Sequence, residues 1–553
     1  MPATETISAD VLVVGAGVAA LRAAIAAREA GAEVVLCCKG IAGRSGNTVV
    51  STADISAYVP QLGVDDSEGV FATDTLQTGG SIADDDLVQL LAERSGEALL
   101  DLERLGITLL RSEGQIDRTR AAGHSRARTY RADSKGLGPN KGLALSVPLA
   151  QRAGAIGVRC LSRTPVVRIA TGDGQIAGAV AVDMESRDFV RIAAPAVVVA
   201  AGGASHLFAR TNGTAEATGD AIVYALRAGA KARDLEFVQW HPTRMDEPVP
   251  LFLTNGLLAD GAVFRDAQGR RFMPDYDERA DLAPRDVLSK AVYLEGKGGR
   301  GVGGGVYLDC SAIPADRIAL RHAYLASVLR ERGVDFPNQW LVVSPATHFL
   351  MGGIAIDRQA SSTVPGLFAA GESAGGIHGA NRLGGNAFCE GLVFGTIAGA
   401  AAARYAADRT SPRFDSDTEA LICTSVDAGH ADPRPAIASA WRELRQTMWD
   451  HVSLVRTEAG LDEAEAILAA LAGAAGELRG RDPSEAARIL ELRASIDCAR
   501  LITSAARCRE ESRGAHWRVD FPETRPEWLG SIYASWPLAA DSPVLTFRPK
   551  IVR

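Results

Sequence analysis

Cysteine is scarce in this sequence, and its spacing does not suit a metal site. Eight cysteines are scattered over 553 residues without a CxxC pair, and only Cys37 and Cys38 are adjacent, inside an apolar segment. Structural zinc sites and cysteine-bound iron–sulfur clusters need thiolates at close, regular spacing. The sequence therefore predicts neither kind of site, and scattered cysteines are typical of a reducing compartment.

Excess positive charge and long apolar runs are also lacking. Lysine and arginine number 59 against 67 acidic residues, a net charge of −8, which argues against nucleic acid or an acidic membrane surface as a partner. The first ten residues, MPATETISAD, are polar and show no secretory signal. No apolar run approaches the length that spans a membrane. We therefore expect a cytoplasmic protein with no direct membrane span.

Glycine, by contrast, is abundant, and its first cluster lies between two strand-like segments. The β-branched run at residues 10–14 leads into GAGVAA (residues 15–20), a helical stretch and a second apolar segment, EVVLCCK. This order predicts a strand–turn–helix–strand unit of the dinucleotide-binding kind. Gly15 would permit the tight turn, Gly17 would let the backbone approach a pyrophosphate at the helix N-terminus, and Ala20 replaces the third glycine. Without the flanking strands, the same letters would indicate only a helix start.

The second strand ends without the acidic residue that usually holds the adenosine ribose of NAD. Lys39 and Gly40 stand at that position, which disfavours NAD as the cofactor. Much farther along the chain, residues 195–203 (PAVVVAAGG) and 365–372 (PGLFAAGE) each look like a buried strand that ends in small residues. We therefore expect a nucleotide-binding domain made of two separate segments.

The length and the patterning predict how the rest of the chain is divided. A chain of 553 residues is too long for one core and favours two to four domains. Turn signals with little periodicity mark an insertion, and Ala/Leu/Glu-rich helical spacing follows residue 406. The predicted fold class is α/β: a discontinuous Rossmann-like domain at 1–235 and 346–405, an inserted α+β domain at 236–345, and a C-terminal helical domain and tail at 406–553.

Six short motifs resemble one family. They are TNGTAEATGDA, EFVQWHPT, LFLTNG, LAPRDV, PATHFLMGGIAID and HGANRLGGNAF, and a late segment, ESRGAHWRVDFP, is similar to the family's C-terminal signature. In order and spacing they resemble the flavoprotein subunit of succinate dehydrogenase and fumarate reductase, and its soluble relative L-aspartate oxidase. The resemblance runs almost end to end. It implies an FAD-dependent oxidoreductase with FAD on the discontinuous domain, a capping domain over the flavin, and a dicarboxylate substrate between them.

The resemblance also implies which side chains bind the substrate. His241 and Thr254 match the residues that hold one carboxylate, and Asn255 follows them in the same motif. His348 and Arg382 match those that hold the other carboxylate, while Arg285 matches the catalytic arginine that exchanges a proton with the substrate carbon as hydride passes to or from flavin N5. Chemistry agrees with these roles, because an arginine fork fits a carboxylate and histidine and threonine supply further donors.

Each of these residues also has a plainer interpretation. Arg285 precedes Asp286 and could form a local ion pair at a helix start, while His241 before a proline could be a turn residue. His348 and His378 could be core histidines. Only the shared order and spacing of the motifs favour a site.

The cofactor residues follow from the glycine motif and from the resemblance together. They are Gly15, Gly17, Ala19, Ala20, Lys39, Gly40, Ser45, Asn47, Thr48, Ala201, Gly202, Asp220, Glu372, Asn386, Ala387 and Phe388. The membrane-linked relatives carry a histidine that binds FAD covalently in a segment that here reads RSGNT (residues 44–48). Because this segment has no histidine, we expect FAD to be bound non-covalently.

Three departures from the family concern the reaction. After Thr254 the family has a glutamate and, three residues on, an arginine that are thought to pass protons, but this chain has Asn255 and Leu258. L-Aspartate oxidase has a glutamate before its GGH-like turn, where this chain has Ala121 and Ala122. In the third departure, Ala53-Asp54 replaces a Gly-Gly pair, so that Asp54 is either a new carboxylate near the flavin ring or a solvated capping residue.

These departures lead to one hypothesis and several alternatives. Reducing fumarate requires a proton on carbon at every turnover, whereas oxidation releases one, so we expect dehydrogenation of an amino- or N-substituted succinate. The alternatives are a fumarate reductase or succinate dehydrogenase subunit with a rerouted proton path, L-aspartate oxidase itself, and a non-enzymatic flavin-binding protein. The electron acceptor is left open among oxygen, a quinone and an iron–sulfur partner.

Overall fold

The computed structural model describes residues 4–63, 65–112, 114–121, 123–254, 256–536, 540 and 542–551. The chain divides into two compact units. The first unit comprises Met1–Ala209, Gly213–Val238 and Phe349–Arg553, and the second comprises Arg210–Asn212 and Gln239–His348. Each unit has its own sheets and its own apolar core.

The nucleotide-binding part of the first unit is a five-stranded parallel sheet. Its order is β20 (Leu367–Ala369), β12 (Ala196–Val199), β2 (Val11–Val14), β3 (Val34–Cys37) and β8 (Arg159–Leu161). The residues of β2, β3 and β12 are buried throughout, as expected for Val- and Leu-rich strands with both faces covered. The pairing of β12 with β20 confirms that two segments far apart in the sequence complete one sheet.

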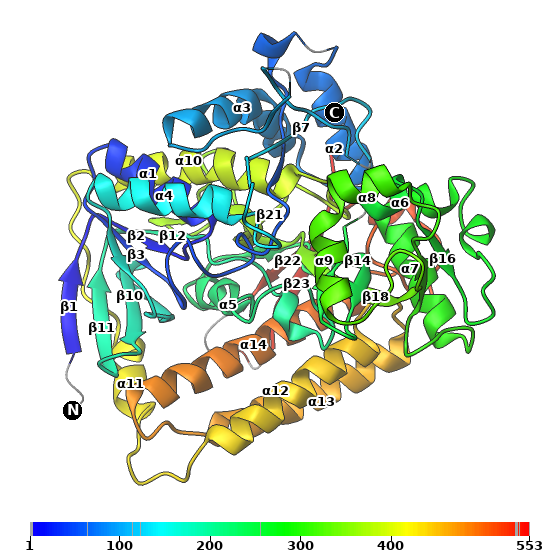
Figure 1. The fold of residues 1–553 in the computed structure, drawn as a ribbon. Helices are drawn as coiled ribbons and strands as arrows, with labels where there is room; N and C mark the ends of the chain where they lie inside the picture. The colour runs from blue at the N-terminus through cyan, green and yellow to red at the C-terminus, as the bar shows by residue number, and fades with distance from the viewer. Residues whose placement is uncertain are drawn as a thin grey trace. The chain divides into compact units, whose positions relative to one another are not determined.

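Helices α1 (Val18–Glu29) and α10 (Asn386–Ala406) pack against each other beside this sheet (Figure 1). Gly395 and Gly399 allow their close approach: a Cβ on Gly395 would stand 2.6 Å from the Ala19 carbonyl oxygen, and one on Gly399 would stand 2.0 Å from that of Ala23. We expected no apolar run of membrane-spanning length. Helix α10 is long and apolar enough, but 72% of its apolar window is buried inside the protein, as for a core helix.

Further helices of the first unit surround this core. They are α2 (Glu68–Thr78), α3 (Asp85–Arg104), α4 (Leu143–Ala155) and α5 (Asp220–Arg227). Short strand pairs join loops of the same unit: β4 (Asp54–Ser56) with β7 (Thr129–Arg131), and β5 (Arg111–Ser112) with β6 (Gln115–Ile116). The β4–β7 pair joins the segment that follows RSGNT (residues 44–48) to the end of the loop that begins after β6.

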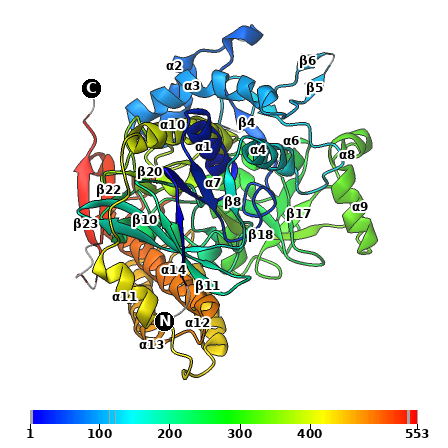
Figure 2. The same cartoon turned by 90° about the vertical axis from the view of Figure 1, so that its left-hand side faces the viewer.

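Two more sheets complete the first unit. One has the order β1 (Thr4–Ser8), β11 (Asp188–Ala193), β10 (Gln175–Asp183) and β9 (Val166–Gly172). The other has the order β21 (Ala374–Gly375), β19 (Gly353–Ala355), β13 (Ala232–Arg233), β22 (Gly530–Ser535) and β23 (Val544–Pro549). Figure 2 shows β22 and β23 side by side at the edge of this second sheet. The C-terminal tail is therefore β-structure that extends a sheet begun hundreds of residues earlier.

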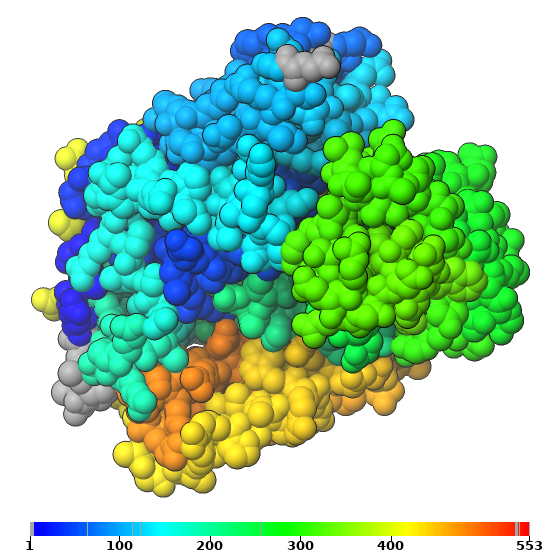
Figure 3. All heavy atoms as spheres, viewed as in Figure 1, coloured from blue at the N-terminus to red at the C-terminus, as the bar shows by residue number. Residues whose placement is uncertain are grey.

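The region after residue 406 is otherwise helical. It contains α11 (Ser416–Thr424), α12 (Arg434–His451), α13 (Glu458–Glu477) and α14 (Pro483–Cys508). Helices α12, α13 and α14 lie side by side, and Figure 3 shows α12 and α13 along one exposed face. Most of α14 is buried, because it packs between these helices and the strands β9 to β11.

The second unit is an α+β structure around its own sheet. The sheet order is β15 (Leu251–Phe252), β14 (Val238–Met245), β18 (Leu341–Leu350), β17 (Val306–Asp309) and β16 (Val263–Arg265). The helices are α6 (Gly256–Ala259), α7 (Arg285–Lys297), α8 (Ala315–Arg321) and α9 (Ala323–Glu331). Apolar side chains from β16, β17 and α7 form the core of this unit.

Candidate functional site

The turn after β2 has the crowded backbone expected where a dinucleotide binds. Gly15 has φ +115°, and a Cβ there would stand 2.2 Å from the carbonyl oxygen of Ala200. Gly17 caps α1 without a side-chain hydrogen bond, while the Val18 amide donates to Thr48 Oγ1 at 3.2 Å. Only a residue without a side chain fits at Gly15, and the backbone amides at an α-helix N-terminus suit a pyrophosphate. These features fit FAD at this turn.

Several other cofactor candidates gather at the carboxyl ends of the same strands. Ala201 and Gly202 follow β12, and Gly202 accepts a hydrogen bond from Ser373 at 2.9 Å. Glu372 follows β20, where its carboxylate accepts from the Leu350 amide at 3.0 Å, and burial raises the pKa of Glu372 to about 7. Ligands of open α/β sheets bind at this edge, so these residues lie where a cofactor of this fold would be expected.

Ala19 and Ala20 occupy the first turn of α1. Ala20 is fully buried, and a Cβ on Gly371 would stand 2.7 Å from the Ala19 Cβ. The small residues predicted from the motif therefore let α1 pass close to the turn that precedes Glu372.

Lys39 and Asp220 pair with each other. Lys39 Nζ donates to Asp220 at 2.9 Å, to Glu491 of α14 at 2.6 Å and to Thr218 at 2.6 Å. Burial alone would lower the pKa of Lys39, but the two carboxylates outweigh it and raise the pKa. Both cofactor candidates thus belong to an ion-pair cluster that ties the end of β3 to α14, and sequence reasoning missed Glu491.

The RSGNT segment contacts the TNGTAEATGDA segment. Asn47 Oδ1 accepts a hydrogen bond from the Thr214 amide at 2.8 Å. Ser45 donates to the Ile41 carbonyl at 3.0 Å, and a Cβ on Gly40 would stand 2.2 Å from Ser45 Oγ. These contacts hold residues 40–47 against the TNGTAEATGDA segment.

Arg382 lies in the glycine-rich loop before α10. It is 7% exposed, its Nη1 donates to the Leu383 carbonyl at 3.0 Å, and its guanidinium lies 4.5 Å from the ring centre of Phe349. Asn386, Ala387 and Phe388 form the first turn of α10, which begins without a side-chain cap. A buried cation and an α-helix N-terminus without a side-chain cap, four residues apart, suit negatively charged groups.

His378, in the same loop, forms a buried pair with Glu390 of α10. Its Nε2 lies 2.8 Å from Glu390 Oε2, and its ring meets Phe349 edge-on at 5.4 Å. These contacts are those of a core histidine, which is the plainer interpretation of His378.

The segment around Ala121 lies against this loop. A Cβ on Gly384 would stand 3.2 Å from the Cβ of Ala121, and a Cβ on Gly123 would stand 2.6 Å from Leu383 Cδ2. Ala122 lies outside the described residues. A side chain at position 121 would therefore project beside the residues that follow Arg382.

Asp54 takes part in a cross-strand ion pair. It lies opposite Arg131 in the β4–β7 ladder, accepts from Arg131 Nε at 2.5 Å and accepts from Thr52 at 2.8 Å. Both side chains of the pair are partly exposed. These contacts account for the charge of Asp54 without a flavin.

In the second unit, the two candidate histidines lie on neighbouring strands. His241 of β14 and His348 of β18 have ring centroids 5.5 Å apart, and Phe252 contacts both rings at 4.3 and 5.8 Å. Thr243 approaches Nδ1 of His241 at 3.2 Å, and Asn212 approaches Nδ1 of His348 at 3.1 Å. The structure thus brings together two residues predicted to bind opposite carboxylates.

Arg285 begins α7 directly after Pro284. Its Nη1 donates to Gln239 Oε1 at 3.3 Å, and Ser289 donates to the Trp240 carbonyl at 3.1 Å, so α7 is fastened to the strand that carries His241. Asn255 lies outside the described residues.

The turn that carries Thr254 lies near an ion pair that the sequence did not reveal, and Leu258 follows it in the chain. Leu258 is 5% exposed and belongs to the apolar core of the second unit. His322 Nε2 lies 2.8 Å from Asp260 Oδ2, and the Thr254 hydroxyl and His322 Cε1 lie 3.3 and 3.7 Å from the point where a Cβ on Gly256 would stand. His322 lies in a stretch with helical spacing and belongs to no recognisable motif, so the sequence did not indicate it as a candidate.

Comparison with known proteins agrees with these features. A family model described as an FAD binding domain matches residues 10–388, and one described as the fumarate reductase flavoprotein C-term matches residues 441–552. One component of the fumarate reductase (CoM/CoB) of Methanothermobacter marburgensis is 35% identical and covers 96% of this chain and 97% of its own length. L-Aspartate oxidase of Caulobacter vibrioides is 34% identical, with 93% of this chain and 94% of that protein covered.

The similarity extends to a solved structure. The E. coli quinol fumarate reductase FrdA chain matches with a TM-score of 0.89 at 27% identity, covering 99% of this chain and 97% of that chain. The likeness therefore includes both units and the C-terminal helices.

Proposed function

The chain belongs to the family of FAD-dependent oxidoreductases that includes L-aspartate oxidase and the flavoprotein of fumarate reductase, and we propose that it dehydrogenates an amino- or N-substituted succinate. FAD, when bound, accepts the hydride that leaves the substrate carbon. The cofactor candidates around Gly15, Glu372 and the start of α10 would hold it without a covalent bond, because the RSGNT segment offers no histidine.

The substrate roles follow from the chemistry of each residue. Arg382 would bind one carboxylate through its planar fork, with His348, while His241 and Thr254 would bind the other, with Asn255 adjacent. Arg285 would take the proton from the substrate carbon. Arginine can accept a proton only where its charged form is disfavoured. This requires an active site that is closed to water.

The observation that favours oxidation is the apolar burial of Leu258. A leucine packed in the core of the second unit cannot carry a proton toward Arg285. In a dehydrogenation the hydride leaves to FAD and the proton passes to Arg285, which must release it again. A substrate amine can accept that proton, so the reaction does not depend on a relay along this route. Ala121, beside Gly384, adds no carboxylate that would require an unsubstituted ammonium, which agrees with a substituted amine.

The test is anaerobic mixing of the purified holoprotein with succinate, aspartate and N-substituted aspartates, followed by the loss of visible flavin absorption. We expect the N-substituted aspartates to reduce the flavin fastest. The variant Arg285→Gln should keep its flavin and lose this reduction. Turnover with fumarate and a reduced dye alone, without reduction by any succinate derivative, would contradict the proposal.

A second candidate, fumarate reduction with a rerouted proton path, is favoured by the His322–Asp260 pair. An imidazole can pass a proton between its two ring nitrogens, and this one is hydrogen-bonded to a carboxylate and flanks the Thr254 turn. In this case His322→Phe should abolish fumarate turnover. Arg321→Gln is the matched control, because Arg321 also pairs with Asp260, at 2.7 Å, and carries no exchangeable imidazole proton.

Turnover measurements on the same purified holoprotein can identify the electron acceptor. Peroxide formed in air indicates oxygen, dye or quinone reduction without peroxide indicates a quinone, and turnover that requires a co-purified iron–sulfur protein indicates a separate electron-transfer partner.

A further inference from the structure

We propose that His124 and Arg128 are positioning residues that hold the Gly384 carbonyl, and with it the loop between Arg382 and α10, in a fixed conformation. The proposal concerns the first unit alone, where all of these residues lie. It rests on the proposed function in one respect, namely the role of Arg382 in binding a carboxylate.

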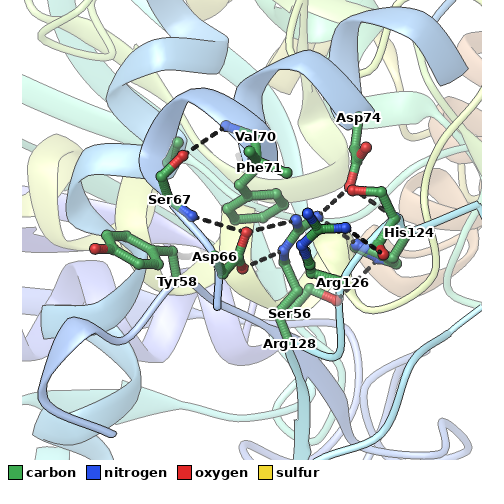
Figure 4. A network of polar contacts seen from close by, with 12 residues as sticks. Ser56, Tyr58, Asp66, Ser67, Val70, Phe71, Asp74, His124, Arg126 and Arg128 are labelled. Carbon is green, nitrogen blue, oxygen red and sulfur yellow. Dashed lines mark hydrogen bonds and ion pairs between the residues drawn. The ribbon is translucent and has the colours of Figure 1, made fainter. Parts of the chain in front are cut away.

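The network is built on the buried Arg128, directly before β7 (Figure 4). Its Nε and Nη2 donate to the two carboxylate oxygens of Asp66 at 2.7 and 2.8 Å, and its Nη1 donates to Asp74 of α2 at 2.5 Å. The side chains of Arg128 and Asp66 are both 1% exposed. The guanidinium also lies 5.0 Å from the ring centre of Phe71. Two carboxylates on one fork leave Arg128 no freedom to rotate.

Arg128 also determines the tautomer of His124. Its Nη1 lies 3.1 Å from His124 Nδ1, and a guanidinium has only donors, so Nδ1 must be the acceptor. The ring proton is therefore on Nε2, which lies 2.8 Å from the Gly384 carbonyl oxygen and donates to it. Burial lowers the pKa of His124 to about 4 and Arg128 acts in the same direction, so the imidazole stays neutral at ordinary pH.

Ser56 is a second donor to the same carbonyl, and we call His124 and Ser56, which together hold the Gly384 oxygen, the clamp. Ser56 Oγ donates to the Gly384 carbonyl at 2.8 Å, and the Ser56 amide donates to the Gly385 carbonyl at 3.1 Å. Both lone pairs of the Gly384 oxygen are thus used. A Cβ on Gly385 would stand 2.2 Å from Ser56 Oγ, so the approach requires glycine at 385.

The loop needs such external bonds because of its own composition. Two successive glycines follow Leu383, and glycine has the largest conformational freedom of any residue. The clamped peptide lies two residues after Arg382 and directly before the N-terminus of α10. A change in its orientation would therefore displace both the cation proposed to bind a carboxylate and the helix start proposed to face the flavin.

The test compares His124→Leu with His124→Gln in the FAD-bound protein. A glutamine amide can donate to Gly384 while its oxygen accepts from Arg128, and leucine can do neither. Losing one buried hydrogen bond to the carbonyl should raise KM for the dicarboxylate about tenfold in His124→Leu, with a smaller change in kcat. His124→Gln should remain within about twofold of the parent protein.

The matched control is His516→Leu. His516 is also fully buried, its Nδ1 lies 2.6 Å from Arg456 and its Nε2 lies 3.3 Å from the Arg509 carbonyl, and neither partner belongs to the loop between Arg382 and α10. It should lower thermal stability without moving KM. Equal KM changes in the two leucine variants, or a His124→Gln variant as impaired as His124→Leu, would overturn the proposal.

Two readouts do not depend on turnover. Titration with succinate or malonate, followed by the perturbation of flavin absorption, should give weaker binding for His124→Leu than for His124→Gln. The visible circular dichroism of the bound flavin should change in His124→Leu and stay unchanged in His124→Gln. If the parent protein binds neither dicarboxylate, the proposed function fails, while the flavin dichroism still tests the clamp. An unchanged spectrum in His124→Leu would then refute it.

Discussion

The buried, neutral His124 predicts how stability depends on pH. In the unfolded chain its pKa returns to the ordinary value of about 6.5, whereas burial lowers the folded value to about 4. A folded pKa below the unfolded one means that the unfolded chain binds the proton first. The neutral contact therefore carries no penalty above the unfolded pKa, and stability is lost as pH falls from about 6.5 through about 4.

The size of the effect follows from the two pKa values. Between about pH 8 and about pH 5 this one group lowers the free energy of unfolding by about 2 kcal/mol. The variant His124→Gln keeps the hydrogen bonds and has no proton to bind. Asp66, Asp74 and Arg128, which face the imidazole, are the same in both proteins, and Asp74 titrates below its ordinary range because the hydrogen bonds from Ser125 and Arg128 outweigh its burial and lower its pKa.

The assay is urea unfolding of both holoproteins at several pH values, followed by tryptophan fluorescence. The difference between the two proteins is the quantity to measure, because they share all other titrating groups. We expect His124→Gln to gain about 2 kcal/mol relative to the parent on going from about pH 8 to about pH 5. A difference that stays constant over this range would refute a buried neutral imidazole at position 124.

Three other substitutions give clear expectations. Gly15→Ala should strongly lower the flavin-to-protein ratio, because the added Cβ would meet the Ala200 carbonyl. Gly31→Ala is the control and should bind FAD normally, since Gly31 also has positive φ but no neighbour within 4 Å of its Cβ. Equal ratios in the two variants would contradict FAD binding at the turn after β2. Ala121→Glu should improve kcat/KM for aspartate relative to succinate, since it places a carboxylate beside Gly384, and an unchanged ratio would count against that location. Asp54→Asn should change the unfolding free energy by less than about 1 kcal/mol and leave the flavin spectrum unchanged, as for a partly exposed ion pair; a large spectral shift would place Asp54 at the flavin.

The parts of the fold that the sequence predicted are those encoded by local patterns. The β2–α1–β3 unit follows from alternating strand, glycine and helix signals within forty residues, and the pairing of β12 with β20 follows from two similar apolar segments. The family resemblance predicted FAD and the α/β class because whole motifs, rather than single residues, carried it. The similarity to curated relatives confirms both.

The features that sequence reasoning missed depend on contacts between distant segments. Glu491 reaches Lys39 across more than 450 positions, and β22 pairs with β13 across about 300. The His322–Asp260 pair is 62 positions apart and has no spacing that would distinguish it from a helix surface. The expectation about apolar runs missed α10, because the many glycines and alanines conceal a helix that is long and buried.

These long-range contacts change how the glycine-rich loop at residues 376–385 should be understood. Its sequence supplies one cation, Arg382, among glycines that carry no side chain. Two adjacent glycines cannot by themselves specify where Arg382 lies. The position also depends on contacts from outside the loop, among them Ser56 and His124, and through His124 on Arg128, which is held by Asp66 and Asp74. Substitutions at any of these five positions should therefore alter carboxylate binding without touching the substrate, so the binding properties of the loop are encoded mainly outside it.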